Sequence, residues 1–140
     1  MVILDENIPE SQRQLLRSWR IRALLVGRDI SKKGVKDESL TRFLLKQRYP
    51  TFFTRDEGFY DKKLCHAGYS LVYLAVRPNE SASFVRRLLR HSRFNTRAQR
   101  LGAVIRVSSA GLQMWRLREL RESFLSWSDQ EISRSVTRRR

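Results

Sequence analysis

The chain has 140 residues, with 29 lysines and arginines against 14 acidic residues and a formal net charge of +15. This length suits one domain, and a 41% share of hydrophobic residues argues against a disordered chain. The longest apolar run, residues 69–76, is too short to cross a bilayer, so no segment is expected to span a membrane. One cysteine excludes an internal disulfide and, without a recognisable signal peptide, indicates a cytoplasmic protein.

The first half of the chain alternates strand-like and helix-like segments. Apolar runs predict strands at residues 2–4, 23–26 and 51–54. A helix is predicted over residues 9–19, where Pro9 suits the first turn, and another over residues 37–48, where Asp37 is well placed as the N-cap.

The second half begins with a nearly all-apolar segment, residues 70–76, which is typical of a strand covered on both faces. A helix is predicted to start near Pro78, and residues 108–111 predict a hairpin turn between two further strands. A last helix is predicted from an apolar stripe at spacings of three and four, made of Leu117, Leu120, Phe124 and Trp127.

This order of segments predicts an α/β fold with a mainly parallel central sheet flanked by helices, followed by a C-terminal hairpin and helix. Residues 1–132 are expected to form a single domain, and residues 133–140 a basic C-terminal tail.

The positive charge is concentrated late in the chain. Residues 1–80 hold 15 basic and 10 acidic residues, whereas residues 81–140 hold 14 basic residues, all arginine, and 4 acidic ones. A compact domain with this charge favours a polyanionic partner, and arginine binds phosphate and stacks on bases. Nucleic acid is therefore the expected partner, with an acidic protein, an anionic membrane surface or a simple codon bias as the alternatives.

Three aspartates stand near the expected ends of strands or helices. Asp5 follows the first strand, Asp56 follows the third strand, and Asp37 opens a helix. Ligands of open α/β sheets bind beyond the carboxyl ends of the strands. Carboxylates that converge there suit a hard cation such as Mg²⁺ or Mn²⁺, which orients water in phosphodiester cleavage. The alternative is local: Asp37 caps a helix, Asp56 shapes a turn, and residues 5–7 form a polar loop.

The segments VILDENIP, KDESL and TFFTRDEGFYD together resemble the small toxin-type PIN-like nuclease domains over residues 2–61. The resemblance implies a PIN-like fold and a Mg²⁺- or Mn²⁺-dependent ribonuclease in which Asp5, Asp37 and Asp56 bind the metal and carry the catalysis. Supporting roles are expected at Glu6, Asn7, Glu38, Thr54 and Asp61.

The expected substrate is RNA, because the family acts on RNA and the chain is basic. Many relatives are toxins paired with an antitoxin, so an acidic antitoxin protein is an expected partner, and a homodimer is also expected. The predicted contacts with the RNA backbone come from Arg55, Arg86, Arg87, Arg90, Arg93 and Arg97.

The chain departs from the family pattern in two ways. Full-length PIN nucleases carry a further acid in an early helix, where this chain offers only Glu10 near the helix start. Many relatives read T-x-D-x-D-F, whereas this chain has Gly58 at the second Asp. A non-catalytic PIN-like module that binds RNA or protein is therefore the alternative. A receiver domain also ends its first strand in an acidic pair, but it needs a lysine near the end of a late strand, and the last lysine here is Lys63.

Overall fold

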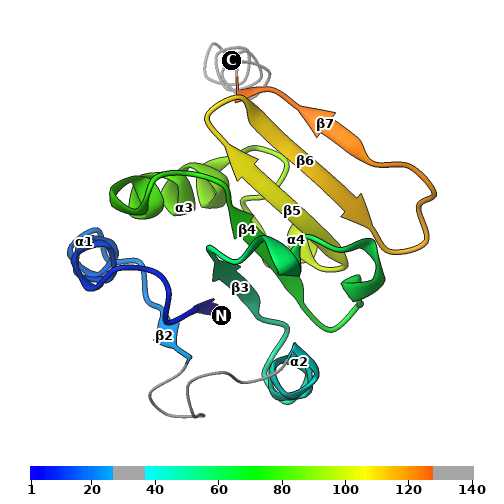
Figure 1. Cartoon of the computed structure of the whole chain (residues 1–140), viewed down its shortest axis with the longest axis horizontal. Helices are drawn as coiled ribbons and strands as arrows, with labels where there is room; N and C mark the ends of the chain where they lie inside the picture. Colours follow the sequence, from blue (N-terminus) through cyan, green and yellow to red (C-terminus); the bar gives the residue numbers. More distant parts are fainter. Residues whose placement is uncertain (27–36, 128–140) are drawn as a thin grey trace.

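A computed structural model of the chain describes residues 1–26 and 37–127. The described residues form a seven-stranded sheet in the order β2-β1-β3-β4-β5-β6-β7 (Figure 1). Its strands are β1 (Val2–Leu4), β2 (Leu24–Leu25), β3 (Thr51–Thr54), β4 (Ser70–Leu74), β5 (Ala103–Ser108), β6 (Gly111–Arg116) and β7 (Ser123–Leu125).

The sheet is mostly parallel. β1 pairs in parallel with both β2 and β3, and β3, β4 and β5 continue the parallel arrangement. β6 and β7 are added antiparallel at one side. Leu4 is paired with Phe53, and the Asp5 amide continues the ladder by donating to the Phe53 carbonyl at 2.9 Å. The carboxyl ends of β1 and β3 therefore meet at the same edge of the sheet.

Helices cover both faces of the sheet. α1 (Glu10–Ser18) and α3 (Ser81–Arg90) pack on one face, and α2 (Asp37–Leu45) packs on the other (Figure 1). The alternation of β3 explains this, because Phe52 faces α2 while Phe53 faces α1 and α3, and both are fully buried. Short helical segments complete the chain: η1 (Glu57–Phe59), η2 (Lys62–Leu64), η3 (Pro78–Glu80) and α4 (Arg97–Arg100).

The predicted α/β order is confirmed, with strands and helices near the expected places. The predicted last helix is wrong over residues 117–126, where the chain turns at Leu117 and then forms β7. β7 pairs with β6 and so satisfies backbone groups that would otherwise lie unpaired at an open edge. Two members of the predicted stripe do not form a buried face, since Leu120 is 86% exposed and Phe124 is 66% exposed.

Trp127 is the buried member of that stripe, and its indole N–H donates to the Ser108 carbonyl at 2.7 Å. The predicted tail, residues 133–140, lies outside the described residues. Within the described part of the chain, no helix is long and apolar enough to cross a membrane.

Candidate functional site

A hydrogen-bonded polar group lies at the carboxyl ends of β1 and β3. Its centre is the hydroxyl of Thr54, which is fully buried. Thr54 Oγ1 donates to Asp5 Oδ2 at 2.6 Å and accepts from the Asp56 amide at 3.0 Å and from Asn7 Nδ2 at 3.2 Å. One hydroxyl thus connects both aspartates and the asparagine.

Asp5 is half-buried and hydrogen-bonded through both carboxylate oxygens, since Oδ1 accepts from the Glu6 amide at 2.8 Å. Burial raises the pKa of this carboxyl, and the nearby charges of Glu6 and Asp56 raise it further. The hydrogen bonds from Thr54 and the Glu6 amide act in the opposite direction. A bound cation would therefore stabilise the ionised form of this carboxyl group, because it would replace the solvation that burial has removed.

Asn7 and Asp56 are fixed by backbone groups of the turn that follows β3. The Arg55 amide donates to Asn7 Oδ1 at 3.0 Å, and the Gly58 amide donates to Asp56 Oδ1 at 2.9 Å. Asp56 is thereby the N-cap of η1. A Cβ at position 58 would lie 3.1 Å from Asp56 Oδ1, so glycine at this departure from the family pattern leaves room for the Asp56 turn.

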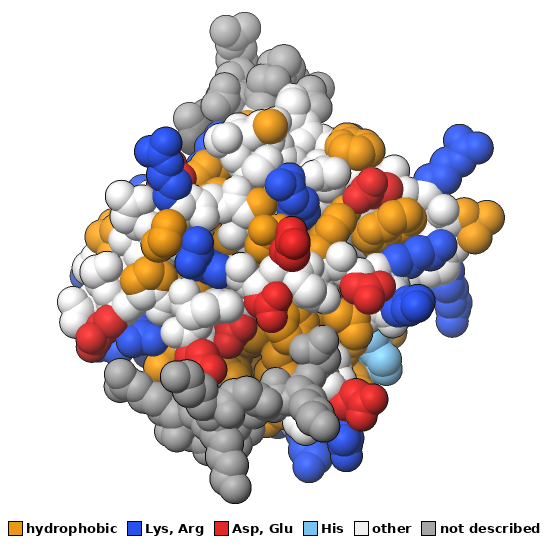
Figure 2. Space-filling view, viewed as in Figure 1, with side chains coloured by type: hydrophobic (Ala, Val, Ile, Leu, Met, Phe, Trp, Pro, Cys, Tyr) orange, Lys and Arg blue, Asp and Glu red, His pale blue; other side chains and the backbone are white. Residues whose placement is uncertain are grey.

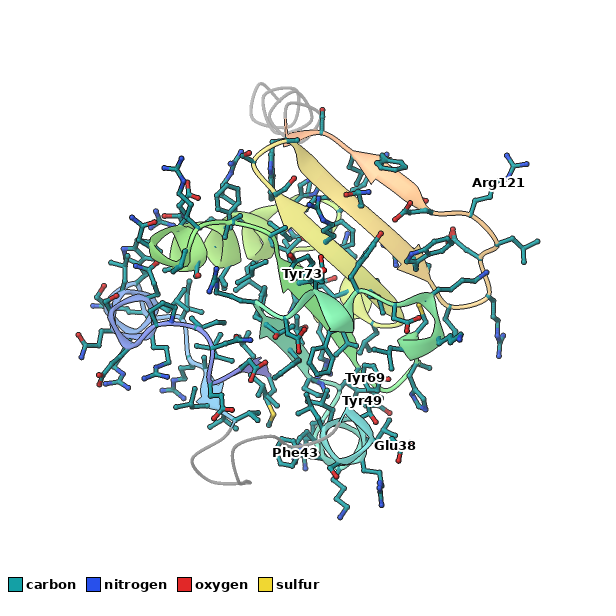
Figure 3. All side chains as sticks on the ribbon, viewed as in Figure 1. Glu38, Phe43, Tyr49, Tyr69, Tyr73 and Arg121 are labelled. Atoms are coloured by element: carbon teal, nitrogen blue, oxygen red, sulfur yellow. The ribbon has the colours of Figure 1, made fainter. Side chains whose placement is uncertain are left out.

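The other predicted acids whose side chains the structure describes do not join this group. Glu6 is exposed, and Asp61 caps η2 by accepting from the Lys63 amide at 2.9 Å. Glu38 is exposed on α2 (Figure 3). Asp37 begins α2, but its side chain lies outside the described residues. Among the described residues, no three His, Cys, Asp or Glu side chains are arranged to hold a metal ion.

The arginines predicted to bind RNA are spread over different parts of the molecule. Arg55 follows Thr54 directly, so it lies beside the acidic group. The Arg86 guanidinium stacks 3.6 Å from the centre of the Trp19 ring, and that of Arg87 lies 4.1 Å from the Trp127 ring. These two contacts tie α3 to neighbouring segments.

Arg97 belongs to the opposite edge of the sheet. Its charge contributes to lowering the pKa of the Met1 amino group, at the start of β1, whereas Asp5 stands at the end of that strand. Arg90 and Arg93 lie at and just beyond the end of α3. The predicted arginines therefore do not form one surface around Asp5.

Two residues that the sequence analysis did not select share the sheet face of Thr54. Tyr73 on β4 alternates with Leu71, and Arg106 on β5 alternates with Val104, which both pack in the core beneath α2. A half-buried arginine inside the apolar strand AVIRVS is a signal that could have been read from the sequence.

Acidic side chains lie near the middle of the face shown in Figure 2, with lysine and arginine side chains around them. Comparison of the chain with models of protein families, with curated proteins and with solved structures found no match. The observed sheet is compatible with a PIN-like α/β fold.

Proposed function

We propose that this protein is a divalent-metal-dependent ribonuclease that cleaves RNA phosphodiester bonds, and that it acts as the toxin of a pair with an acidic antitoxin. The observation that carries the proposal is the Thr54-centred group, in which one hydroxyl joins the Asp5 carboxylate to the Asp56 backbone amide at the carboxyl edge of two adjacent parallel strands. The PIN-like sequence segments and the net charge of +15 support the same reading.

The donor set at this edge suits Mg²⁺ or Mn²⁺. Asp5 and Asp56 present carboxylate oxygens there, which hard cations prefer. Magnesium is commonly held by one or two protein carboxylates, with waters and substrate phosphates completing the coordination. Asp5 and Asp56 would supply these two carboxylates, and Asp37 is the proposed third ligand.

When bound, such a metal would supply charge stabilisation at the phosphate and an activated water. The chain's own part is positioning. Thr54 fixes the Asp5 carboxylate by a hydrogen bond to Oδ2, and the same hydroxyl fixes the start of the Asp56 turn. Asn7 completes the arrangement, because its Nδ2 donates to the Thr54 hydroxyl and its Oδ1 accepts from the Arg55 amide.

A second candidate function is RNA binding without cleavage. It is favoured by one observation, that the described residues do not bring three acidic side chains together. The two functions are distinguished by RNA cleavage, because only the nuclease would cleave RNA when a divalent metal is added.

The experiment is cleavage of a single-stranded RNA by wild type, Asp5→Asn, Asp56→Asn and Glu6→Gln, with Mn²⁺ or Mg²⁺ and with excess EDTA. We expect wild type to cleave only with metal, and each Asp→Asn variant to lose cleavage. Glu6→Gln is the matched control, because Glu6 is exposed and adjacent to Asp5, and we expect it to keep most of its activity.

Wild-type cleavage that persists in EDTA would contradict the metal mechanism. RNA binding by wild type with no cleavage in either metal would favour the binding module. If Glu6→Gln is inactive while Asp5→Asn cleaves normally, the first metal ligand is Glu6 rather than Asp5.

A further inference from the structure

A hollow of about 490 Å³ opens over the end of β4, beside the acidic group. Three arginines from three different segments line it: Arg55 after β3, Arg77 before η3, and Arg106 on β5. Tyr73, Glu80 and Ser109 complete the polar part of its wall. The volume lies in the range of ligand sites, and three arginines in one wall indicate an anionic ligand.

Arg106 is held in place before any ligand arrives. Its Nη1 donates to Gln113 Oε1 at 2.8 Å, and its guanidinium lies 6.0 Å from the centre of the Tyr73 ring. The side chain is half-buried on the sheet, so little rotamer freedom remains to be lost on binding. Its remaining N–H groups are the donors that a phosphate would use.

Arg55 connects the hollow to the acidic group. Its amide donates to Asn7 Oδ1, while its Nη2 donates to the Val76 carbonyl at 3.4 Å, just beyond the end of β4. Its Nε is buried and has no hydrogen-bond acceptor among the described residues. An unpaired buried donor costs free energy, and a ligand oxygen or a water is the usual way to satisfy it.

The one carboxylate in the wall does not cancel the positive charge. Glu80 Oε1 accepts from the Arg77 amide at 3.0 Å, so this carboxylate is engaged by the backbone just before η3. Three arginines against one glutamate leave the hollow with a net positive charge. The hollow is therefore suited to a phosphate rather than to a neutral ligand.

We propose that this hollow binds a phosphodiester group of the RNA chain, next to the phosphate that is cleaved. The inference rests on the proposed function, because the acidic group would make the second contact with the same RNA chain. The volume leaves room for a ribose beside the phosphate, and Tyr73 offers an aromatic ring in the wall (Figure 3). A single inorganic phosphate would leave most of this space empty.

The proposal places the main RNA contact on Arg77 and Arg106 rather than on α3. Arg86 and Arg87 stack on Trp19 and Trp127, so their guanidinium faces are already in use within the protein. Arg77 and Arg106, in contrast, flank the carboxyl ends of the parallel strands, where ligands of such sheets bind.

The test measures binding of a short single-stranded RNA to wild type, Arg77→Gln and Arg106→Gln in excess EDTA, over a series of salt concentrations. Arg121→Gln is the matched control, because it removes the same charge from an exposed side chain that points away from the hollow (Figure 3). Arg77 is exposed, so its variant does not disturb the fold even if Arg106→Gln does. Competition with inorganic phosphate and with a nucleoside monophosphate shows whether the site needs a chain of phosphodiesters.

We expect each hollow variant to bind RNA on the order of tenfold more weakly, and to lose about 0.7 from the slope of log affinity against log salt. Arg121→Gln should lose far less RNA affinity and far less of the salt slope. Inorganic phosphate and the nucleoside monophosphate should both compete poorly with RNA. Equal losses in all three variants, or an unchanged slope in Arg77→Gln, would overturn the inference. Strong competition by inorganic phosphate would show a free-anion site instead. Because binding is measured without metal, a protein that cannot cleave RNA would not by that fact alone produce any of these results.

Discussion

The hydroxyl of Thr54 shows how much of the site depends on a single side chain. It donates one hydrogen bond and accepts two, and its three partners come from both sides of the β1–β3 edge. Because a serine or threonine hydroxyl has one proton and two lone pairs, this hydroxyl is fully used. No other residue type except serine could make the same three contacts from a buried position of this size.

Replacing Thr54 with valine keeps the shape but removes these contacts. We expect Thr54→Val to weaken Mn²⁺ or Mg²⁺ binding on the order of 10–100-fold, as is usual when a partner of a metal ligand is lost. The loss of buried hydrogen bonds should also lower the free energy of unfolding by roughly 1–3 kcal/mol. Metal titration followed by calorimetry and by thermal unfolding measures both effects. Thr54→Ser keeps the hydroxyl, and its metal affinity should stay near wild type; a serine variant as weak as the valine variant would contradict the role.

The raised pKa of Asp5 makes a prediction about pH. Because the folded protein binds this proton more tightly than the unfolded chain, the free energy of unfolding without metal should fall as pH rises from the ordinary value of 3.8 through the raised pKa. Asp5→Asn cannot ionise, so it should unfold at a higher temperature than wild type at neutral pH, and this difference should shrink towards pH 3.8. Thermal unfolding of both proteins in EDTA across this range measures it. A difference that does not vary with pH would show that the carboxyl is not destabilised by burial.

At the scale of elements, α1 and α3 are joined by a buried polar contact. Gln12 is 8% exposed, and its Oε1 accepts from the Ala82 amide at 2.9 Å, at the first turn of α3. The first amides of a helix have no partner within the helix, so Gln12 takes the place of a cap. The contact fixes the start of α3, and with it the segment that carries Arg77 and Glu80.

Gln12→Met retains most of the volume of the side chain but leaves the Ala82 amide without its acceptor. We expect the free energy of unfolding to fall by about 1–3 kcal/mol, as for other unpaired buried donors. Gln14→Met, on the exposed side of the same helix, is the control and should change it little. Chemical denaturation of the two variants and wild type provides the comparison. Equal stabilities of the two variants would show that the contact does not hold α3.

For the whole molecule, the dominant property is its charge of +15 on 140 residues. Like charges at this density repel one another, and the folded state holds them closer together than the unfolded state does. We expect the midpoint of thermal unfolding to rise when the NaCl concentration increases from about 0.02 M to about 0.2 M, because the screening length shortens. The measurement is made in EDTA, to exclude bound metal. A midpoint that falls with added salt would show that attractive ion pairs outweigh the repulsion.

Much of the architecture was determined by the sequence alone. The apolar run TFFT is buried along its whole length, and this matches a strand that is covered on both faces. The local turn after it is also a property of the sequence, because Asp56 and Gly58 are close in the chain and make a cap that needs no distant partner. These features depend on neighbouring residues, and periodicity and turn chemistry are sufficient to predict them.

The contacts of the site were decided by the tertiary structure. Asp5 and Thr54 are 49 residues apart, and they meet because β1 is inserted between β2 and β3, an order that no local pattern specifies. The same pairing of distant strands brings Arg106 into one hollow with Arg55 and Arg77. The spacing of Leu117, Leu120, Phe124 and Trp127 suits a helix when read alone. β6 instead offered a free edge, and pairing with it outweighed the local preference for a helix at residues 123–125.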